Sequence, residues 1–308
     1  MKSRLQLWTA FFVMITPVWA GIEEFNGRWT LRPEADARSR AWWLEIQGAG
    51  TAQLKGRFVG FPGGDMNDIP APAIKGEYLT FTWDKNGRRI DYRLKLQGKA
   101  LVGDYTDNGK RNGLSGARAA EIKDRDDGSR KPGKPVVLFD GKDLSRFSAV
   151  EQGKPLGWEV KDGLLVNQVG ANNLQSGDKF WNFILDAEYR LKPDSNSGIG
   201  LRARYEVQLL EDYGKVQDTH SHGAIYSRIA PSVNASKPAG EWNQMRVRLV
   251  GRYATVILNG KTVVDKGLVE GLTAIATDAD EGAPGPITLQ GDHRIVEFRK
   301  VVVTPLTR

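Results

Sequence analysis

Between Leu201 and Leu209 the chain alternates apolar and polar side chains. The polar positions are Arg202, Arg204, Glu206 and Gln208. A period of two is typical of a β-strand with one buried face. We therefore expect one strand whose other face carries two guanidinium groups, a carboxylate and an amide. That face is either a solvated sheet surface or a ligand-binding surface.

Short runs that fit strands continue along most of the chain. Seven lie between residues 21 and 120, and a second series runs from residue 135 to the end, with the hairpin signal Asn259-Gly260 inside it. No helical period of useful length appears. The prediction is an all-β protein. Residues 21–120 form a small up-and-down β domain, with a lipocalin-like barrel as one form, and residues 135–308 form a jelly-roll sandwich.

Residues 121–134, EIKDRDDGSRKPGK, have a different composition. No large apolar side chain follows Ile122, and charged residues, glycine and proline dominate. Such a segment cannot bury enough apolar surface to offset the entropy lost on ordering. We expect a linker between two domains here.

The first 20 residues have the pattern of a secretory signal peptide. Lys2 and Arg4 precede an apolar run from Leu5 to Ile15, and Ala20 is a small residue at a plausible cleavage point. The apolar run is too short to span a membrane, and no other run is longer. The chain has 0 cysteines, which excludes disulfides and thiol catalysis. We expect a periplasmic or secreted protein, cleaved near Ala20, with no membrane span.

The formal net charge is +7, but the basic residues are scattered and form no run. Nucleic acid is therefore not an expected partner. The 35 glycines, 9 tryptophans and 8 tyrosines suit turn-rich, aromatic-rich β structure.

Several ordered motifs cover the second predicted domain. They are LFDGKDLSRF (138–147), GWEVKDGLL (157–165), NSGIGLR (196–202), YEVQLLED (205–212), GAIYS (223–227), NASKPAGEWN (234–243), LNGKTVVD (258–265) and LQGDHRIVEFRKVVVTPL (289–306). In their order and spacing, residues 135–306 resemble the 3-keto-disaccharide hydrolase family, whose fold is a concanavalin-like jelly roll. Residues 21–120 have no part in this resemblance.

The resemblance implies an oligosaccharide or glycoside ligand and, in some members, cleavage of glycosides whose C3 hydroxyl is already oxidised to a ketone. The ketone acidifies the C2 proton, so a base can remove it while the oxygen on C1 leaves; water then adds back. This route needs a base, an acid and an electrophile for the enolate oxygen. Two alternatives remain open: a non-catalytic, lectin-like carbohydrate-binding module, and ordinary hydrolysis by paired carboxylates.

Three residues are predicted to be catalytic. Glu206 matches the acidic residue of the family's Y-E-x-Q motif, and His293 matches its Q-D-H or Q-x-H pattern. Arg202 offers a planar donor fork that could stabilise an oxyanion. The residues predicted to bind the sugar are Gln208, Asp212, Trp242, Asn243, Gln290, Asp292 and Arg299.

Two further histidines suggest a metal site. In DTHSHGAIY, a strand would place His220, His222 and Asp218 on one face. Imidazole beside carboxylate is a set of ligands that divalent metals accept, and a metal could also polarise the developing enolate. No fixed spacing establishes the site, so the prediction for a cofactor stays open between none and a divalent metal ion.

Overall fold

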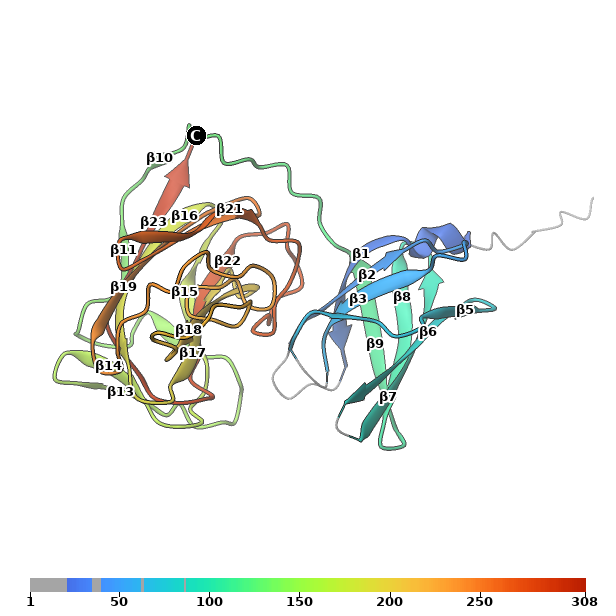
Figure 1. The fold of residues 1–308 in the computed structure, drawn as a ribbon, viewed down its shortest axis with the longest axis horizontal. Helices are drawn as coiled ribbons and strands as arrows, with labels where there is room; N and C mark the ends of the chain where they lie inside the picture. The colour runs from blue at the N-terminus through green and yellow to red at the C-terminus, as the bar shows by residue number, and fades with distance from the viewer. Residues whose placement is uncertain (1–20, 35–39, 62–63, 86) are drawn as a thin grey trace, which may run out of the picture.

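The computed structural model describes residues 21–34, 40–61, 64–85 and 87–308. Figure 1 shows two bodies of strands joined by an extended segment. The predicted signal peptide lies outside the described residues. Within them the one helix is the short 3-10 turn η1 (Ile22–Phe25), so no helix there is long and apolar enough to cross a membrane. The all-β prediction is confirmed.

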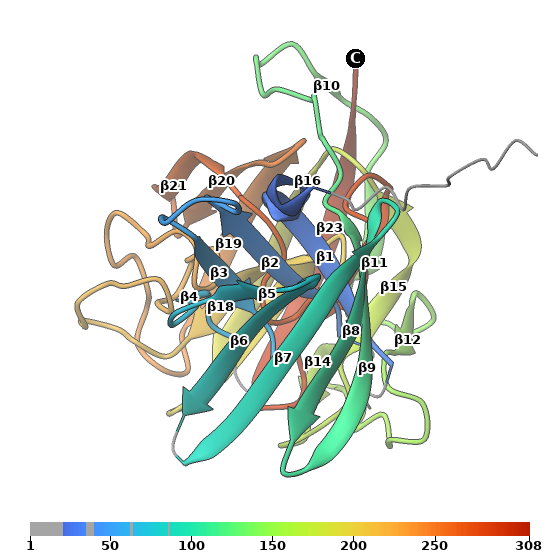
Figure 2. The same ribbon diagram turned by 90° about the vertical axis from the view of Figure 1, so that its right-hand side faces the viewer.

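The first body is one antiparallel sheet whose strands run up and down. Their order is β4-β3-β2-β1-β9-β8-β7-β6-β5, so β1 and β9 join the two halves of the meander. The strands are β1 (Gly27–Pro33), β2 (Trp42–Gln47), β3 (Lys55–Val59), β4 (Asn67–Asp68), β5 (Ala73–Lys75), β6 (Tyr78–Lys85), β7 (Arg88–Gln97), β8 (Ala100–Asp107) and β9 (Lys110–Arg118). Figure 2 shows the long, twisted ribbons of β6 to β9 facing the viewer.

Aromatic side chains fill the core of this first sheet. The rings of Phe81 and Tyr92 stack with centroids 4.5 Å apart, and Phe58 meets Tyr92 at 5.1 Å, edge to face. Such geometries add to the stabilisation from burial alone. The aromatic-rich composition therefore has a direct structural role.

The second body is a sandwich of two antiparallel sheets. The larger sheet has the order β13-β14-β23-β16-β19-β20-β21, with β10 and β11 also paired to β23; the smaller has the order β12-β15-β22-β17-β18. The larger sheet contains β10 (Lys131–Pro132), β11 (Val136–Phe139), β13 (Trp158–Lys161), β14 (Leu164–Asn167), β16 (Phe183–Leu191), β19 (Trp242–Val250), β20 (Tyr253–Leu258), β21 (Lys261–Leu268) and β23 (Val296–Thr307). The smaller sheet contains β12 (Phe147–Ala149), β15 (Leu174–Phe180), β17 (Asn196–Leu201), β18 (Tyr205–Leu210) and β22 (Gly285–Leu289).

Apolar side chains from both sheets meet between them. Leu185 and Val247 enter the core from the larger sheet, and Ile199 and Val207 enter it from the smaller one; all are fully buried. Strand β23 pairs with β16 along one edge and with β10, β11 and β14 along the other. This sandwich is the jelly roll expected from the sequence.

The segment 201–209 is not one strand, so that prediction was wrong. β17 ends at Leu201 and β18 begins at Tyr205, and the Arg204 amide donates to the Leu201 carbonyl at 3.1 Å. Arg202 and Ala203 have φ values of 57° and 55°, the left-handed conformation at the two central residues of a tight turn, and they lie in the three-residue connection 202–204 between the paired residues Leu201 and Tyr205. Because the chain reverses direction at this turn, Arg202 and Arg204 are not part of the row of polar side chains on β18, which starts at Glu206.

The segment predicted as a linker, residues 121–134, lies against the jelly roll. Asp124 Oδ2 accepts hydrogen bonds from Trp181 Nε1 at 2.6 Å and from Asn182 Nδ2 at 3.0 Å. Asp126 forms an ion pair with Arg248 at 2.9 Å. Two of the charged side chains in this segment thus have fixed partners, those of Asp124 in the turn between β15 and β16 and that of Asp126 on β19.

Candidate active site

A pocket of about 230 Å³ lies on the face of the smaller sheet that points away from the sandwich core. All five strands of that sheet contribute to its lining, either directly or through the residue next to one end. Five residues predicted from the sequence line it: Glu206, Gln208, Gln290, Asp292 and His293. The structure therefore brings together residues from YEVQ and LQGDH, which are far apart in the chain.

Strand β18 places Glu206 and Gln208 in the pocket because alternate side chains point to opposite faces of a sheet. Its neighbour β17 has Gly200 opposite Glu206 and Gly198 opposite Gln208. A β-carbon on Gly198 would lie only 2.4 Å from Glu206 Oε1. The glycine of the NSGIG motif thus leaves the room that the carboxyl group occupies.

The Glu206 side chain is buried, and this burial changes its protonation. Burial, with a smaller contribution from the negative charge of Asp292, raises the pKa of the Glu206 carboxyl to about 8. At neutral pH the group is therefore mostly protonated. It can then donate a proton to a leaving oxygen.

Asp292 and His293 form a pair at the pocket. Asp292 Oδ1 lies 2.8 Å from His293 Nδ1. An ionised carboxylate can only accept a hydrogen bond, so Nδ1 carries the proton and Nε2 of the neutral ring keeps its lone pair. The Asp292 side chain is 4% exposed and that of His293 is 44% exposed. A buried carboxylate that orients a more exposed imidazole is a suitable arrangement for a general base.

Gln208 and Gln290 each present an amide oxygen for which the described residues supply no donor. Both Oε1 atoms are buried without a hydrogen bond. Leaving such an atom unpaired costs about 1–3 kcal/mol. Hydroxyl groups of a sugar are donors that would satisfy them.

Sequence reasoning missed other residues that line the pocket. Asn196 and Tyr226 belong to the NSGIG and GAIY motifs, so the motifs were an available signal for them. Glu151 carried no such signal. Neither did Arg40 and Gly64, which come from the first body of the structure.

Arg202 does not line this pocket. Its guanidinium is fully buried beneath the hairpin turn and donates to the backbone carbonyls of Trp181 at 2.7 Å and Gly251 at 2.8 Å. It also stacks on the Trp181 ring at 4.0 Å. Its contacts hold the turn in place.

Asp212 also lies outside the pocket lining, in a buried network. It accepts hydrogen bonds from Ser236 Oγ at 2.6 Å and from the backbone amide of His222 at 2.9 Å. The His222 ring lies between Ser236 Oγ at 2.9 Å and the Tyr189 hydroxyl at 2.5 Å. Burial lowers the pKa of His222 to about 4, so the ring stays neutral and supports the fold.

The metal candidates do not converge. Residues 218–222 belong to a turn region instead of a strand, so His220 Nε2 reaches Asp65 at 2.9 Å while His222 enters the core. Asp218 Oδ1 accepts from the backbone amide of His220 at 2.8 Å. Across the part of the chain that is described, no three His, Cys, Asp or Glu side chains are placed to hold a metal ion. The side chains of this segment do not fit a metal.

Trp242, Asn243 and Arg299 lie on the larger sheet instead. The Arg299 guanidinium stacks on the Trp242 ring at 4.4 Å and pairs with Glu188 at 2.6 Å. Asn243 is buried, and its Oδ1 accepts from Asn259 Nδ2 at 2.7 Å. None of the three lines the pocket.

Comparison with solved structures finds several that are similar to part of the chain. Two proteins of Parabacteroides distasonis ATCC 8503 are provisionally described as glycosyl hydrolases. One is 26% identical, with a TM-score of 0.49 over 60% of this chain and 94% of that one. The other is 25% identical, with a TM-score of 0.45 over 56% and 100%. LamA from Z. galactanivorans, solved in complex with laminaritriose and laminaritetraose, is 11% identical, with a TM-score of 0.37 over 56% and 98%.

No curated protein matches the chain. The sequence model of the 3-keto-alpha-glucoside-1,2-lyase-like domain, however, matches residues 134–304. That range is more than half of the chain and includes every strand of the smaller sheet. The chain therefore belongs to the family of 3-keto-alpha-glucoside-1,2-lyase-like domains.

Proposed function

We propose that this protein cleaves 3-keto glycosides by elimination across C1 and C2, followed by addition of water. Membership of the family supports a carbohydrate-active protein. The observation that carries the finer proposal is that a protonated carboxyl, Glu206, lines the same pocket as the oriented imidazole of His293. Elimination needs one proton donor and one proton acceptor, and these two groups supply them.

In the first step His293 Nε2 takes the C2 proton, which the neighbouring ketone makes acidic. The bond from C1 to the glycosidic oxygen then breaks, and Glu206 gives its proton to that oxygen as it leaves. The products are an alcohol and a sugar with a C1–C2 double bond. Water then adds its hydroxyl to C1 and a proton to C2, which yields the free 3-keto sugar.

Gln208 and Gln290 would bind the sugar ring through their unpaired amide oxygens. A volume of about 230 Å³ is below the roughly 300–1,000 Å³ typical of sites for drug-sized ligands. The pocket therefore suits one sugar ring and the atoms next to its glycosidic bond.

Turnover of a 3-keto disaccharide in D₂O tests this proposal. The expected result is release of the free 3-keto sugar with deuterium at C2, because elimination removes that proton and hydration replaces it from solvent. The unoxidised disaccharide, which lacks the acidic C2 proton, is the matched control and should remain intact.

Three results would contradict the proposal. Equal cleavage of the unoxidised disaccharide would favour hydrolysis by paired carboxylates. Release of the 3-keto sugar without deuterium at C2 would rule out the elimination step. Glycan binding without any turnover would favour the lectin-like binding module.

We also propose that the protein is exported and processed near Ala20, with residues 21–120 and 135–308 as its two domains. The signal-like pattern of residues 1–20 supports export. Mass spectrometry of the protein recovered from the periplasm or the medium should give a mature chain that starts near Gly21. A chain that keeps Met1 and stays in the cytoplasm would contradict export.

A further inference from the structure

The pocket is not built by the jelly roll alone. Arg40 and Gly64 of the N-terminal body also line it, and both lie outside residues 134–304, which the family match covers. The N-terminal body therefore reaches the site where the proposed chemistry takes place.

Asp65, next to Gly64, contacts two aromatic side chains of the jelly roll. Its Oδ1 accepts a hydrogen bond from the Tyr226 hydroxyl at 3.0 Å and lies 2.9 Å from His220 Nε2. The rings of His220 and Tyr226 meet edge to face, with centroids 4.9 Å apart. Tyr226 lines the pocket, so one carboxylate of the N-terminal body fixes the position of a pocket residue.

Neighbouring contacts bring the same loop close to the jelly roll. A β-carbon on Gly64 would lie 2.3 Å from the Ala274 β-carbon, and Ala274 also lines the pocket. The amide of Met66 donates to Ser227 Oγ at 2.8 Å. Only a residue without a side chain fits at position 64 while the two loops stay this close.

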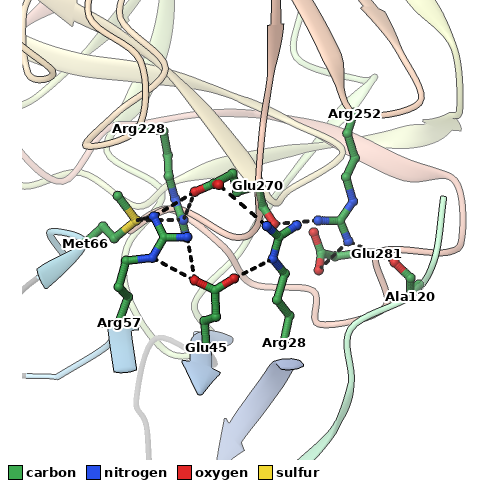
Figure 3. Close-up of polar contacts among 9 residues, drawn as sticks. All are labelled: Arg28, Glu45, Arg57, Met66, Ala120, Arg228, Arg252, Glu270 and Glu281. Carbon is green, nitrogen blue, oxygen red and sulfur yellow. Dashed lines mark hydrogen bonds and ion pairs between the residues drawn. The ribbon is translucent and has the colours of Figure 1, made fainter. Parts of the chain in front are cut away.

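An ion-pair network holds the two bodies together beside this loop (Figure 3). Glu270 of the jelly roll pairs with Arg57 at 2.9 Å and with Arg28 at 3.5 Å. The same two arginines pair with Glu45 of β2, at 2.5 Å and 2.9 Å. The two acidic groups, one from each body, thus share the two arginines.

Trp43 adds an apolar contact to that network. Its side chain is fully buried and belongs to the same hydrophobic cluster as the jelly-roll core. The Arg228 guanidinium lies over the ring at 4.1 Å and donates to the Leu272 carbonyl at 2.7 Å. Buried aromatic and charged contacts of this kind favour a fixed arrangement of the two bodies.

We propose that the N-terminal domain completes the sugar site, with Asp65 as a positioning residue for Tyr226 and with Gly64 and Arg40 as part of the pocket wall. The Tyr226 hydroxyl donates its hydrogen bond to Asp65, so its oxygen can accept a hydrogen bond from a sugar hydroxyl. The N-terminal domain then limits the substrate to short glycosides, because its wall restricts the space beside the bound ring. This inference rests on the proposed function for its substrate.

Kinetics of full-length variants test the positioning role. Asp65→Ala should raise KM for a 3-keto disaccharide about tenfold, the size of one lost hydrogen bond, with little change in kcat. Asp65→Asn keeps an oxygen that accepts from Tyr226 and should restore most of the loss. Gly64→Val should raise KM as well, because its side chain pushes the loop away from Ala274. The control is Asp104→Ala, which removes a carboxylate that pairs with Arg111 inside the first sheet at 2.6 Å.

A second measurement is independent of turnover. Burial, and then the charge of Asp65, raises the pKa of the Tyr226 hydroxyl. With tyrosine labelled by ¹³C at Cζ, the Tyr226 resonance is the one that Tyr226→Phe removes. At neutral pH its chemical shift should change in Asp65→Asn, because the hydroxyl then donates to a neutral oxygen instead of a carboxylate, and Asp104→Ala should leave it unchanged.

An unchanged chemical shift of Tyr226 in Asp65→Asn would overturn the inference, whatever the activity. An unchanged KM in Asp65→Ala, or an equal rise in Asp104→Ala, would overturn it as well. A protein without turnover whose Tyr226 resonance still changes in Asp65→Asn would refute the proposed function while supporting the contact between the domains.

Discussion

The two sheets of the jelly roll both carry polar side chains on the face away from the core, but these side chains have different surroundings. On the larger sheet Arg246 pairs with Asp186 at 2.7 Å, and Arg299 with Glu188 at 2.6 Å, at the surface. On the smaller sheet the Gln208 side chain is buried, and its Oε1 lacks a partner among the described residues. Exposed pairs contribute about 0–1 kcal/mol, whereas a buried unpaired amide oxygen costs about 1–3 kcal/mol.

This difference shows how to recognise the site. The polar pairs on the larger sheet satisfy one another, whereas Gln208 and Gln290 of the pocket keep unused acceptor atoms. The pocket on the smaller sheet is therefore where we propose that the ligand binds. The following experiments change one sheet at a time.

The largest effect is expected from Glu206→Gln. This change removes the proposed proton donor and keeps the size of the side chain, so kcat/KM for a 3-keto disaccharide should fall about 10²–10⁴-fold. The matched change on the larger sheet is Glu188→Gln, which should leave kcat/KM unchanged. Equal losses in both variants would remove the functional distinction between the sheets.

A smaller effect, with a shift in pH dependence, is expected from Asp292→Asn. The wild-type rate should fall as pH rises through about 8, where Glu206 loses its proton. Removing the charge of Asp292 lowers the pKa of Glu206, so this decline should move to lower pH. The variant should also lose some rate, because a neutral amide oxygen accepts from His293 Nδ1 more weakly than a carboxylate and makes the ring less basic. A pH profile of kcat/KM measures both effects. If kcat/KM of the variant falls at the same pH as that of the wild type, Asp292 does not act on Glu206.

Glu206 also makes stability depend on pH. Its pKa is about 8 in the folded state against 4.5 as the ordinary value, so the folded state binds the extra proton between these limits. Its stabilising contribution is complete below about pH 4.5 and is lost as pH rises through 8, with a slope of up to about 1.4 kcal/mol per pH unit. Urea unfolding from pH 5 to 9 should show a flatter dependence for Glu206→Gln. Identical slopes would mean that Glu206 is ionised in the folded protein.

The smallest effect is expected from Gln208→Leu. Removing the unpaired amide should raise the free energy of unfolding by about 1 kcal/mol, while sugar binding weakens about tenfold. Gln244→Leu is the control on the larger sheet, at an exposed position of β19. It should change neither quantity. Chemical denaturation measures the free energy of unfolding, and calorimetry measures sugar binding. If Gln208→Leu is less stable than the wild type but binds the sugar equally well, Gln208 does not belong to the binding site.

Much of the fold follows from the sequence, because period-two runs and Asn-Gly signals are local and the ordered motifs identify the jelly roll. Glu206 and Gln208 of YEVQ and His293 of LQGDH, which the motifs suggested as site residues, line one pocket in the structure. The turn at Arg202 was missed because neither it nor Ala203 is a residue that usually adopts positive φ. Buried hydrogen bonds from Arg202 stabilise that conformation, and those bonds exist only in the tertiary structure.

The position of Trp242 and Arg299 on the larger sheet, away from the pocket, could not be predicted for a similar reason. Motif order shows which segments belong to the domain, but not which of two stacked sheets each strand enters. The contribution of Arg40 and Gly64 to the pocket was equally hidden, since it depends on how a second domain packs. Long-range placement of this kind leaves no periodic signal in the sequence.

The position of β23 has a consequence for how the protein folds. It is the last jelly-roll strand in the chain, yet it lies between β16 on one edge and β10, β11 and β14 on the other. Earlier strands can form the β19 to β21 hairpins on their own, but the larger sheet cannot be completed until β23 joins it. The edges of β14 and β16 that pair with β23 therefore stay unpaired until late in folding, and such long-range pairing is slow and prone to aggregation.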